Sequence, residues 1–403
     1  MAENKTGQCI PQLRFPEFKN DGEWAVMKVK DICSIETGKS NTQDQVKDGS
    51  YPFFIRSEKP VRSNKYLYDC EAVITIGDGK IGQVFHYYNG KFDLHQRCYK
   101  MSDFQGVDGR YFYYYFSSHF YERAMRMSAK ATVDSVRLEM IADMPIALPP
   151  TFKEQKVIAS CLTSLDAYIA SSKAKLEQLK AHKKGLMQKL FPAPGKTLPE
   201  YRFPEFSSNV EWKPIRLGDL FDRVTEKNDQ NNENVLTISA QYGLVSQYDY
   251  YKKKVAADDL RNYYLIRQGD FAYNKSRSTG FPYGAVKSLQ LYNQGVVSTL
   301  YLCFRPNNTI IDTRFFDYYF ETELFNKEIG LIAQEGARHH GLLNISTEDF
   351  FNIPLIIPNR DEQNKIAESL SSICFLINSF YDTISSLEEY KKGLMLQLFP
   401  TND

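Results

Sequence analysis

Paired cysteines, metal-ligand clusters, long apolar runs and an excess of either charge are all missing from this sequence. Its 7 cysteines are an odd number and are widely scattered, with no Cys-x-x-Cys pair and no histidine at metal-ligand spacing. No window approaches the roughly 18–20 apolar residues of a membrane span, and the first ten residues lack the apolar stretch of a secretory signal. We therefore expect reduced thiols, no bound metal or cofactor, no membrane association and a cytoplasmic location.

Charge is nearly balanced, with 50 Lys+Arg against 49 Asp+Glu and a formal net charge of +1. A protein that coats nucleic acid through bulk charge needs a basic excess, so that class is excluded, whereas a local basic cleft is not. With 42% hydrophobic and 25% charged residues, the composition is that of a folded protein. The length of 403 residues predicts two or three domains.

A two-fold internal repeat organises the chain. The sequence Leu-Arg-Phe-Pro-Glu-Phe at 13–18, followed by Trp24, returns as Tyr-Arg-Phe-Pro-Glu-Phe at 201–206, followed by Trp212. Residues 154–192 recur as 362–400, and both segments begin with Glu-Gln and end with Lys-Lys-Gly-Leu-Met-x-x-Leu-Phe-Pro. The intervening stretches show little obvious similarity to each other. This layout predicts that the shared segments have the same structural role in each half, while the two divergent stretches bind two different targets.

Both recurring segments have the apolar spacing of a long helix. Their apolar residues alternate steps of four and three, the heptad pattern of a coiled coil, which Ser172, Lys183 and Lys391 interrupt. Prolines precede each segment and a Phe-Pro pair ends it, so the first helix is predicted over residues 152–190, roughly 58 Å at about 1.5 Å per residue. The predicted seam consists of Ile158, Leu162, Leu165, Ile169, Leu176, Leu179, Leu186, Leu190, Ile366, Leu370, Ile373, Ile377, Phe380, Ile384, Leu387, Leu394 and Leu398.

Pairing of these two helices explains the seam better than the alternative, in which each helix packs along a globular core. An antiparallel pair would hold the two variable blocks at opposite ends of a rod, related by a pseudo-two-fold axis. We predict an α+β fold divided into a mixed α/β domain at 1–150, a long helix at 151–192, a linker at 193–200, a second mixed domain at 201–358 and a second long helix at 359–403. The linker is rich in proline, which breaks helices.

The variable blocks are expected to mix strands and helices. Apolar runs at 72–76 and 296–302 predict strands, and aromatic segments at 111–127 and 315–332 predict one helix each, with rings that belong to the core. The Gly-x-Gly-x-x-Gly at 77–82 suggests a dinucleotide site, but the residues after it read as a hairpin with an Asn89-Gly90 turn. We therefore exclude that site. The Thr-Gly-Lys-Ser at 37–40 lacks the upstream glycine of a P-loop and is excluded too.

Short polar loops remain as the candidate binding residues, because Arg, Lys, amide and hydroxyl groups can meet phosphates and base edges. The alternative for each residue is a solvated surface loop. No catalytic set emerges, since adenine-methylation motifs, metal clusters and nucleophile elbows are all missing. The candidates for DNA contact are Arg56, Lys80, His95, Gln96, Arg97, Lys130 and Thr132 in the first block, and Asn274, Lys275, Arg277, Ser278, Arg338, His339 and His340 in the second.

The duplicated motifs resemble the specificity (S) subunit of Type I restriction-modification systems over nearly the whole chain. The resemblance rests on the Arg-Phe-Pro-Glu-Phe and Trp that start each half, on Pro-x-x-x-Glu-Gln at 150–155 and 358–363, and on the Lys-Lys-Gly-Leu-Met-x-x-Leu-Phe-Pro that closes each half. It implies two target-recognition domains, each of which reads one half of a bipartite double-stranded DNA site, and helices whose length sets the unread spacer.

The resemblance also implies partners. Two modification subunits bind S-adenosylmethionine and methylate adenine N6, and restriction subunits translocate and cleave DNA. The outer faces of the helices are expected to dock the modification subunits, and this chain is expected to be non-catalytic. Two other functions stay open, namely an enzyme that carries its own methyl-transfer or nuclease activity, as fused relatives do, and a coiled-coil scaffold that joins two protein-binding domains.

Overall fold

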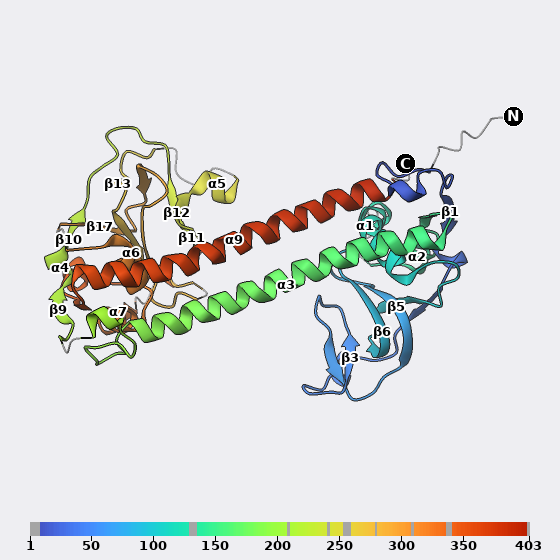
Figure 1. Cartoon of the computed structure of the whole chain (residues 1–403), viewed down its shortest axis with the longest axis horizontal. Coiled ribbons are helices and arrows are strands. Elements are labelled where there is room, and N and C mark those ends of the chain that lie inside the picture. The colour runs from blue at the N-terminus through green and yellow to red at the C-terminus, as the bar shows by residue number, and fades with distance from the viewer. Residues whose placement is uncertain are drawn as a thin grey trace. The chain divides into compact units, whose positions relative to one another are not determined.

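A computed structural model describes residues 9–128, 135–207, 210–239, 242–252, 259–278, 280–307, 310–335 and 341–400. The chain divides into two compact units, of which unit 1 comprises Met1–Ser172 and Thr383–Asp403, and unit 2 comprises Lys173–Asp382. Two 39-residue helices, α3 (Phe152–Leu190) and α9 (Arg360–Leu398), each continue from one unit into the other (Figure 1). Each unit therefore contains part of both long helices, which the sequence-based division treats as separate segments.

Unit 1 is built on a six-stranded sheet with the order β2-β7-β5-β6-β3-β4, in which all neighbours are antiparallel except β3 and β6. The helix α1 (Gly109–Ser128) packs on this sheet, and Phe116 contacts Phe85 with ring centroids 5.7 Å apart. A separate antiparallel pair, β1 and β8, precedes α3. The other elements are η1 (Pro16–Phe18), β1 (Ala25–Lys28), η2 (Val29–Asp31), β2 (Ser34–Thr37), η3 (Thr42–Asp44), β3 (Tyr51–Phe54), β4 (Val61–Ser63), β5 (Tyr68–Ile76), β6 (Phe85–Leu94), β7 (Cys98–Ser102), α2 (Leu138–Ala142) and β8 (Pro145–Leu148).

Unit 2 contains a four-stranded antiparallel sheet with the order β10-β17-β14-β15, together with the two-stranded pairs β9-β20, β11-β12, β13-β16 and β18-β19. The elements of this unit are η4 (Pro204–Phe206), β9 (Lys213–Arg216), α4 (Leu217–Leu220), β10 (Phe221–Val224), β11 (Leu236–Ser239), β12 (Gly243–Ser246), α5 (Gln247–Tyr251), β13 (Tyr264–Arg267), β14 (Phe271–Asn274), β15 (Ala285–Ser288), β16 (Gln294–Val297), β17 (Leu302–Pro306), α6 (Thr313–Tyr319), α7 (Glu323–Ile332), β18 (Gln334–Glu335), β19 (Leu343–Asn344), α8 (Thr347–Phe351) and β20 (Pro354–Ile357).

The two units share a topology that their sequences conceal. The order β2-β7-β5-β6 in unit 1 matches β10-β17-β14-β15 in unit 2, and the pair β1-β8 matches β9-β20. The helices that follow the sheets also begin alike: Asp108 accepts a hydrogen bond from the amide of Tyr111, and Asp312 accepts one from the amide of Phe315. An aspartate in this position caps the first turn of a helix. The duplication therefore includes the variable blocks.

The long helices run antiparallel within each unit. In unit 1, Leu162 of α3 shares a buried core with Leu398 of α9, and in unit 2, Leu190 of α3 shares one with Leu370 of α9. The early residues of α3 thus meet the late residues of α9, and the reverse holds in the other unit. Every residue of the predicted seam is buried or partly buried, and Ser172 is buried as well. The burial pattern along both helices follows the predicted heptads.

Two local predictions about the variable blocks are correct, and three are wrong. The strand at 72–76 lies in β5 and the helix at 111–127 lies in α1. The segment 315–332, however, forms two helices, because the Thr322 side chain accepts from the amide of Phe325 and starts α7 as a new helix. The stretch 296–302 is interrupted by a turn between β16 and β17. Asn89 and Gly90 lie inside β6 and form no turn, since Gly90 pairs with Cys70 of β5.

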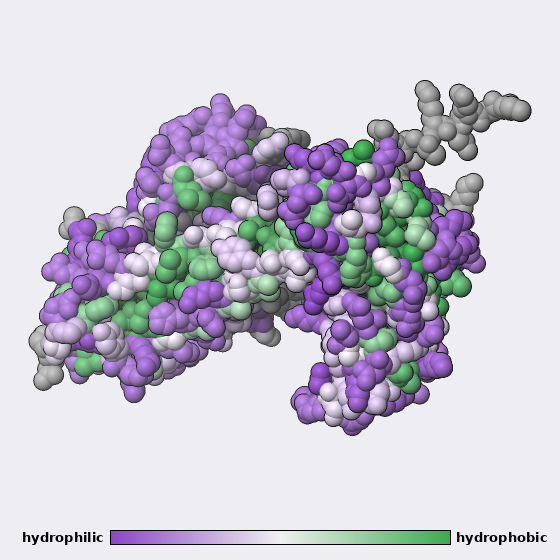
Figure 2. Space-filling model, turned by 45° about the vertical axis from the view of Figure 1, so that its right-hand side comes forward, coloured by the Kyte–Doolittle hydropathy of each residue, from purple (hydrophilic) through white to green (hydrophobic). Residues whose placement is uncertain are grey.

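The surface in view in Figure 2 is largely hydrophilic, with smaller apolar areas between the polar ones. Single exposed apolar side chains are ordinary on a folded protein. Within the described ranges, no helix has both the length and the apolar character needed to cross a membrane.

Candidate DNA interface

In unit 1, three loops that carry predicted DNA-contacting residues meet around Asp78. Arg97 Nη1 lies 2.5 Å from Asp78 Oδ2, and Arg56 Nη1 lies 3.2 Å from both carboxylate oxygens. Burial would raise the pKa of the Asp78 carboxyl group, but the two guanidinium groups lower this pKa below its usual range. The structure thus places two predicted residues on a carboxylate that sequence reasoning did not include among the candidates.

The connection between β6 and β7 is a tight turn that fixes the backbone of Arg97. The Cys98 amide donates to the His95 carbonyl at 2.9 Å, the Arg97 amide donates to His95 Nδ1 at 3.1 Å, and the Gly77 amide donates to the Arg97 carbonyl at 2.7 Å. His95 is buried, and burial lowers the pKa of its ring. His95 therefore supports the turn from inside, whereas Gln96 and Arg97 are exposed.

Lys80 lies on the connection between β5 and β6, next to the Asp78 cluster. Its ammonium group is 3.2 Å from Glu58 Oε1, and both side chains are well exposed. An exposed ion pair of this kind contributes little to stability, so the Lys80 ammonium group can leave the Glu58 carboxylate and bind a phosphate at little cost.

The corresponding loop of unit 2 follows β14, which occupies the place of β5 in the strand order. Asn274 Oδ1 accepts from the amide of Ser276 at 3.0 Å, which holds the start of the loop in a turn. Lys275 is half-buried, whereas Arg277 and Ser278 are exposed. The four predicted residues of this loop therefore lie together. Five further predicted residues lie outside the described ranges: Lys130, Thr132, Arg338, His339 and His340.

Sequence reasoning missed an aromatic surface in unit 2. The short helix α5 exposes Tyr248, Tyr250 and Tyr251. Elsewhere in the unit, Asn274 Nδ2 at the end of β14 donates to Tyr301 Oη at 3.4 Å. The run Tyr-Asp-Tyr-Tyr-Lys-Lys-Lys at 248–254 is the sequence signal that could have revealed the aromatic surface, because exposed rings beside cations suit nucleic acid.

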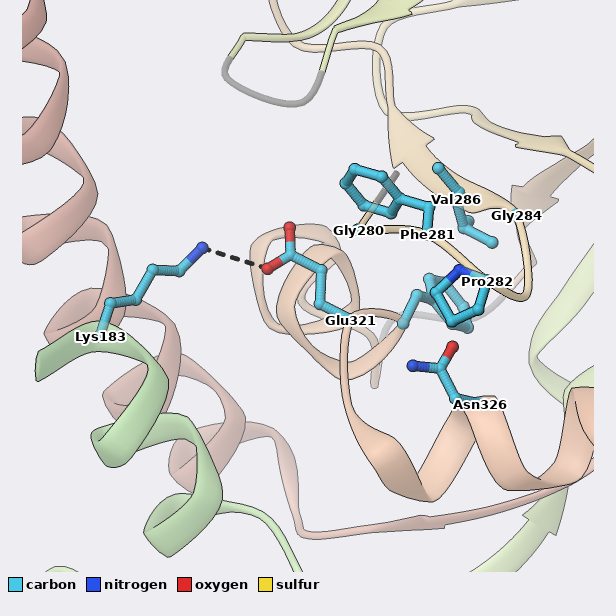
Figure 3. A pocket seen from close by; sticks show the side chains of 10 residues that line it. Lys183, Gly280, Phe281, Pro282, Gly284, Val286, Glu321 and Asn326 are labelled. Atoms are coloured by element: carbon cyan, nitrogen blue, oxygen red, sulfur yellow. Dashed lines mark hydrogen bonds and ion pairs between the residues drawn. The ribbon is translucent and has the colours of Figure 1, made fainter. Parts of the chain in front are cut away.

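A partly buried ionic group in unit 2 joins α3 to the variable block. Lys183 of α3 lies 3.1 Å from Glu321, which also pairs with the buried Lys287 of β15. Burial would raise the pKa of Glu321, but the two ammonium groups lower it to about 2. Glu321 borders a cavity of about 280 Å³, into which Phe281 and Asn326 also project (Figure 3). The polar lysine that interrupts the seam of α3 therefore anchors this helix to unit 2.

The equivalent lysine of the other helix has a matching role in unit 1. Lys391 of α9 lies 2.5 Å from Asp166 of α3 and 5.4 Å from the centre of the Tyr114 ring. Lys183 likewise lies 5.2 Å from the centre of the Tyr318 ring in unit 2. The two lysines that interrupt the predicted seam thus form partly buried ion pairs. In the described part of the chain, no group of three His, Cys, Asp or Glu side chains could hold a metal ion.

Comparison with known families decides what the duplicated units are. The family model described as "Type I restriction modification DNA specificity domain" matches residues 21–181 and again residues 209–379. The chain belongs to this family. Each specificity domain contains the sheet of one unit and, with it, one of the loop clusters described above.

Curated members of the family resemble this specificity protein over most of their length. The Type I restriction enzyme EcoDI specificity subunit of Escherichia coli is 23% identical over 380 residues, which cover 87% of this chain and 81% of that protein. The MjaVIII specificity subunit of Methanocaldococcus jannaschii is 24% identical over 414 residues, which cover 95% of this chain and 92% of that protein. The crystal structure of the S subunit from M. genitalium has the same fold, with a TM-score of 0.63 at 14% identity over 98% of this chain and 100% of that one.

Proposed function

We propose that this specificity protein is the DNA-reading subunit of a Type I restriction-modification complex, and that each unit reads one half of a bipartite sequence. The observation that supports this proposal is the duplication of a DNA specificity domain in two units of equal topology. A polar loop follows the equivalent strands β5 and β14, with Asp78 and Lys80 in the first loop and Lys275 and Arg277 in the second. Two such loops with different side chains suit two different half-sites.

The loops combine the groups that DNA recognition needs. Arg56, Lys80 and Arg97 supply cations in unit 1, and Lys275 and Arg277 supply them in unit 2. Contacts of cations with phosphates give affinity and register, while contacts with base edges give specificity. The near-neutral net charge of the whole chain then implies that binding depends on these local groups and on partner subunits.

We further propose that α3 and α9 set the number of unread base pairs and dock two modification subunits. Each helix has 39 residues and continues from one unit into the other, so its length constrains both. Apolar side chains remain exposed along the helices, among them Tyr168 of α3 and Phe375, Tyr390 and Leu396 of α9. Exposed aromatic and aliphatic groups of this kind are enriched in protein interfaces.

In this proposal the chain carries out no chemistry itself. The modification subunits bind S-adenosylmethionine and methylate adenine, and restriction subunits translocate and cleave the DNA. A specificity subunit needs only to position double-stranded DNA for these partners. An enzyme with its own activity would instead label DNA from S-adenosylmethionine when the purified chain is tested alone, which the proposal predicts not to occur.

A selection from random double-stranded DNA tests the proposal. The complex of this chain with its modification subunit should enrich one asymmetric bipartite motif, and the modification subunit alone should enrich none. Binding should weaken steeply as salt rises, because phosphate contacts release counterions. Enrichment of no motif by an assembled complex, with protein partners bound to both units and no DNA affinity at low salt, would identify a scaffold instead.

A further inference from the structure

The same tight turn occurs at equivalent places in the two units. In unit 1 the turn follows β6, and its first residue, His95, accepts from the Arg97 amide through its ring and from the Cys98 amide through its carbonyl. In unit 2 the turn precedes β17, the equivalent of β7. Its first residue, Ser298, accepts from the Leu300 amide through its hydroxyl at 3.3 Å and from the Tyr301 amide through its carbonyl at 3.0 Å.

Each turn presents two exposed side chains from a fixed backbone. Gln96 and Arg97 are exposed in unit 1, and Thr299 and Leu300 are exposed at the same two positions in unit 2. The hydrogen bonds within each turn fix its backbone, so the Cα positions of these exposed residues are fixed as well. The decisive difference is at the second position, where a cation in one unit is replaced by an aliphatic group in the other.

Both turns lie against the candidate DNA-contacting loop of their unit. The Gly77 amide donates to the Arg97 carbonyl at 2.7 Å, and Gly77 begins the loop after β5. In unit 2, Nδ2 of Asn274, the last residue of β14, donates to Tyr301 Oη at 3.4 Å, directly before the loop begins. The turn and the loop therefore form one surface in each unit. A surface that faces DNA through the loop brings the turn to the DNA as well.

The guanidinium group of Arg97 is held on one side and open on the other. Asp78 Oδ2 accepts from Nη1, while the Arg97 side chain remains 60% exposed. A carboxylate that holds one edge of a guanidinium group fixes its plane and leaves other N–H donors for a ligand. The pair of acceptors that best matches two parallel N–H donors in the major groove is O6 and N7 of guanine.

Leu300 offers the opposite chemistry at the same position. Its side chain is 65% exposed at the tip of the turn, so its apolar surface is available for a contact. It has no hydrogen-bonding group, so it can read a base only through an apolar contact. The apolar group that the major groove presents is the methyl group of thymine.

We propose that Arg97 reads a guanine in the first half-site and that Leu300 reads the methyl group of a thymine in the second. Asp78 is the positioning residue for Arg97. This inference rests on the proposed function and adds the identity of one base pair in each half of the site. It also explains how one turn, used twice in the same fold, separates a G·C pair from an A·T pair.

Base analogues test each contact separately in the assembled complex with the modification subunit. Each guanine of the selected motif is replaced in turn by 7-deazaguanine, which lacks the N7 acceptor, and each thymine by deoxyuridine, which lacks the methyl group. Wild-type complex should lose about 5- to 150-fold in affinity at one guanine of one half-site. It should lose roughly fourfold at one thymine of the other half-site.

Variants then assign these two positions to the two side chains. Arg97→Ala should abolish the penalty at that guanine and leave the deoxyuridine penalty unchanged, and Leu300→Ala should do the reverse. Asp78→Asn should reduce the guanine penalty without removing it. The matched controls are Arg126→Ala on α1 and Leu331→Ala on α7, both of which replace exposed side chains and should leave both penalties in place.

The outcomes separate this inference from the proposed function. If the wild-type complex selects no bipartite motif, the proposed function fails. If it selects one, but Arg97→Ala and Leu300→Ala keep both analogue penalties, the inference is wrong while the function stands. An Arg97→Ala complex whose affinity falls equally for specific and unrelated DNA would show a phosphate contact, which also overturns the inference.

Discussion

Arg14 donates to both carboxylate oxygens of Glu154, and each of the two distances is 2.7 Å. The pair is buried, with side-chain exposures of 7% and 0%. Arg202 and Glu362 repeat the same bidentate contact in unit 2, also at 2.7 Å. The duplicated Arg-Phe-Pro-Glu-Phe motif therefore has a structural role, since its arginine fastens the start of each half to the first turn of a long helix.

Replacing the arginine should destabilise one unit. Arg14→Ala leaves the Glu154 carboxylate buried without its partner, which typically costs about 3–5 kcal/mol. The chain has 2 tryptophans, and Trp24 and Trp212 are buried in different units. Urea unfolding of a Trp212→Phe background, monitored by the fluorescence of Trp24, should show this loss in the free energy of unfolding.

The exposed Lys19→Ala variant is the control for this measurement, and we expect a change within about 0.5 kcal/mol. In a Trp24→Phe background, Arg202→Ala should lower the free energy of unfolding of unit 2 by a similar amount, as monitored by the fluorescence of Trp212. An unchanged unfolding midpoint in both arginine variants would show that the duplicated contact does not support the fold.

The ion pairs of Glu321 predict a pH dependence of stability. The two lysines lower the pKa of Glu321 to about 2 in the folded state, below its ordinary value of 4.5. Its stabilising contribution is therefore fully present above pH 4.5 and is lost as the pH falls from 4.5 toward 2. The difference in unfolding free energy between wild type and Glu321→Gln should be constant from pH 7 to about 5.5 and should shrink at lower pH.

Urea unfolding at pH 7, 5.5, 4.5 and 3.5 checks this prediction, with Glu233→Gln in an exposed loop as the control. The control should follow the wild-type curve at every pH. A difference between wild type and Glu321→Gln that grows as the pH falls would contradict the assigned ion pairs.

The length of the long helices should control the spacer of the DNA site. Seven residues inserted after Ser172 in α3 and seven after Asp382 in α9 keep the heptad phase and lengthen each helix by about 10.5 Å. At roughly 3.4 Å per base pair, the spacer should grow by about three base pairs while both half-sites stay the same. The same insertion in the linker at 193–200 is the control. An unchanged spacer in the helix variant would argue against the role of the helices.

Buried thiols should resist modification in the folded protein. Burial raises the pKa of Cys33 and of Cys98 to about 12, and it also raises the pKa of Cys303. Because the thiolate is the reactive form, these three cysteines should stay unmodified by a thiol reagent at pH 8, as mapped by mass spectrometry. All 7 cysteines should react in denaturant. Rapid labelling of Cys33 or Cys98 before unfolding would contradict the packing described for unit 1.

The first long helix could be predicted from sequence to the residue, because the heptad pattern and the flanking prolines are local signals, whereas the second, placed at 359–403, ends at Leu398. The interiors of the variable blocks could not. Asn89-Gly90 has the composition of a hairpin turn, yet the pairing of Gly90 with Cys70 across the sheet overrides this local preference. The break at Thr322 depends on a single capping hydroxyl within an otherwise helical segment.

The candidate site was predictable in part. Arg56 and Arg97 are far apart in sequence, and only the fold places both on Asp78. Burial of His95 was not visible either, since a histidine followed by Gln96 and Arg97 reads as exposed. Leu300 was assigned to a strand because of its apolar neighbours, and only the observed turn identifies it as an exposed tip. Long-range contacts, which sequence alone does not specify, decide the first two cases, and the local turn at Ser298 decides the third.

Single-molecule methylation sequencing tests the central claim most directly. DNA is taken from a methylation-free host that expresses this chain with its modification subunit. We predict one asymmetric bipartite motif that carries N6-methyladenine in both half-sites, and no motif when this chain is omitted. Assembly of the complex without any new methylated motif would contradict the account that the two units read DNA for a methyltransferase.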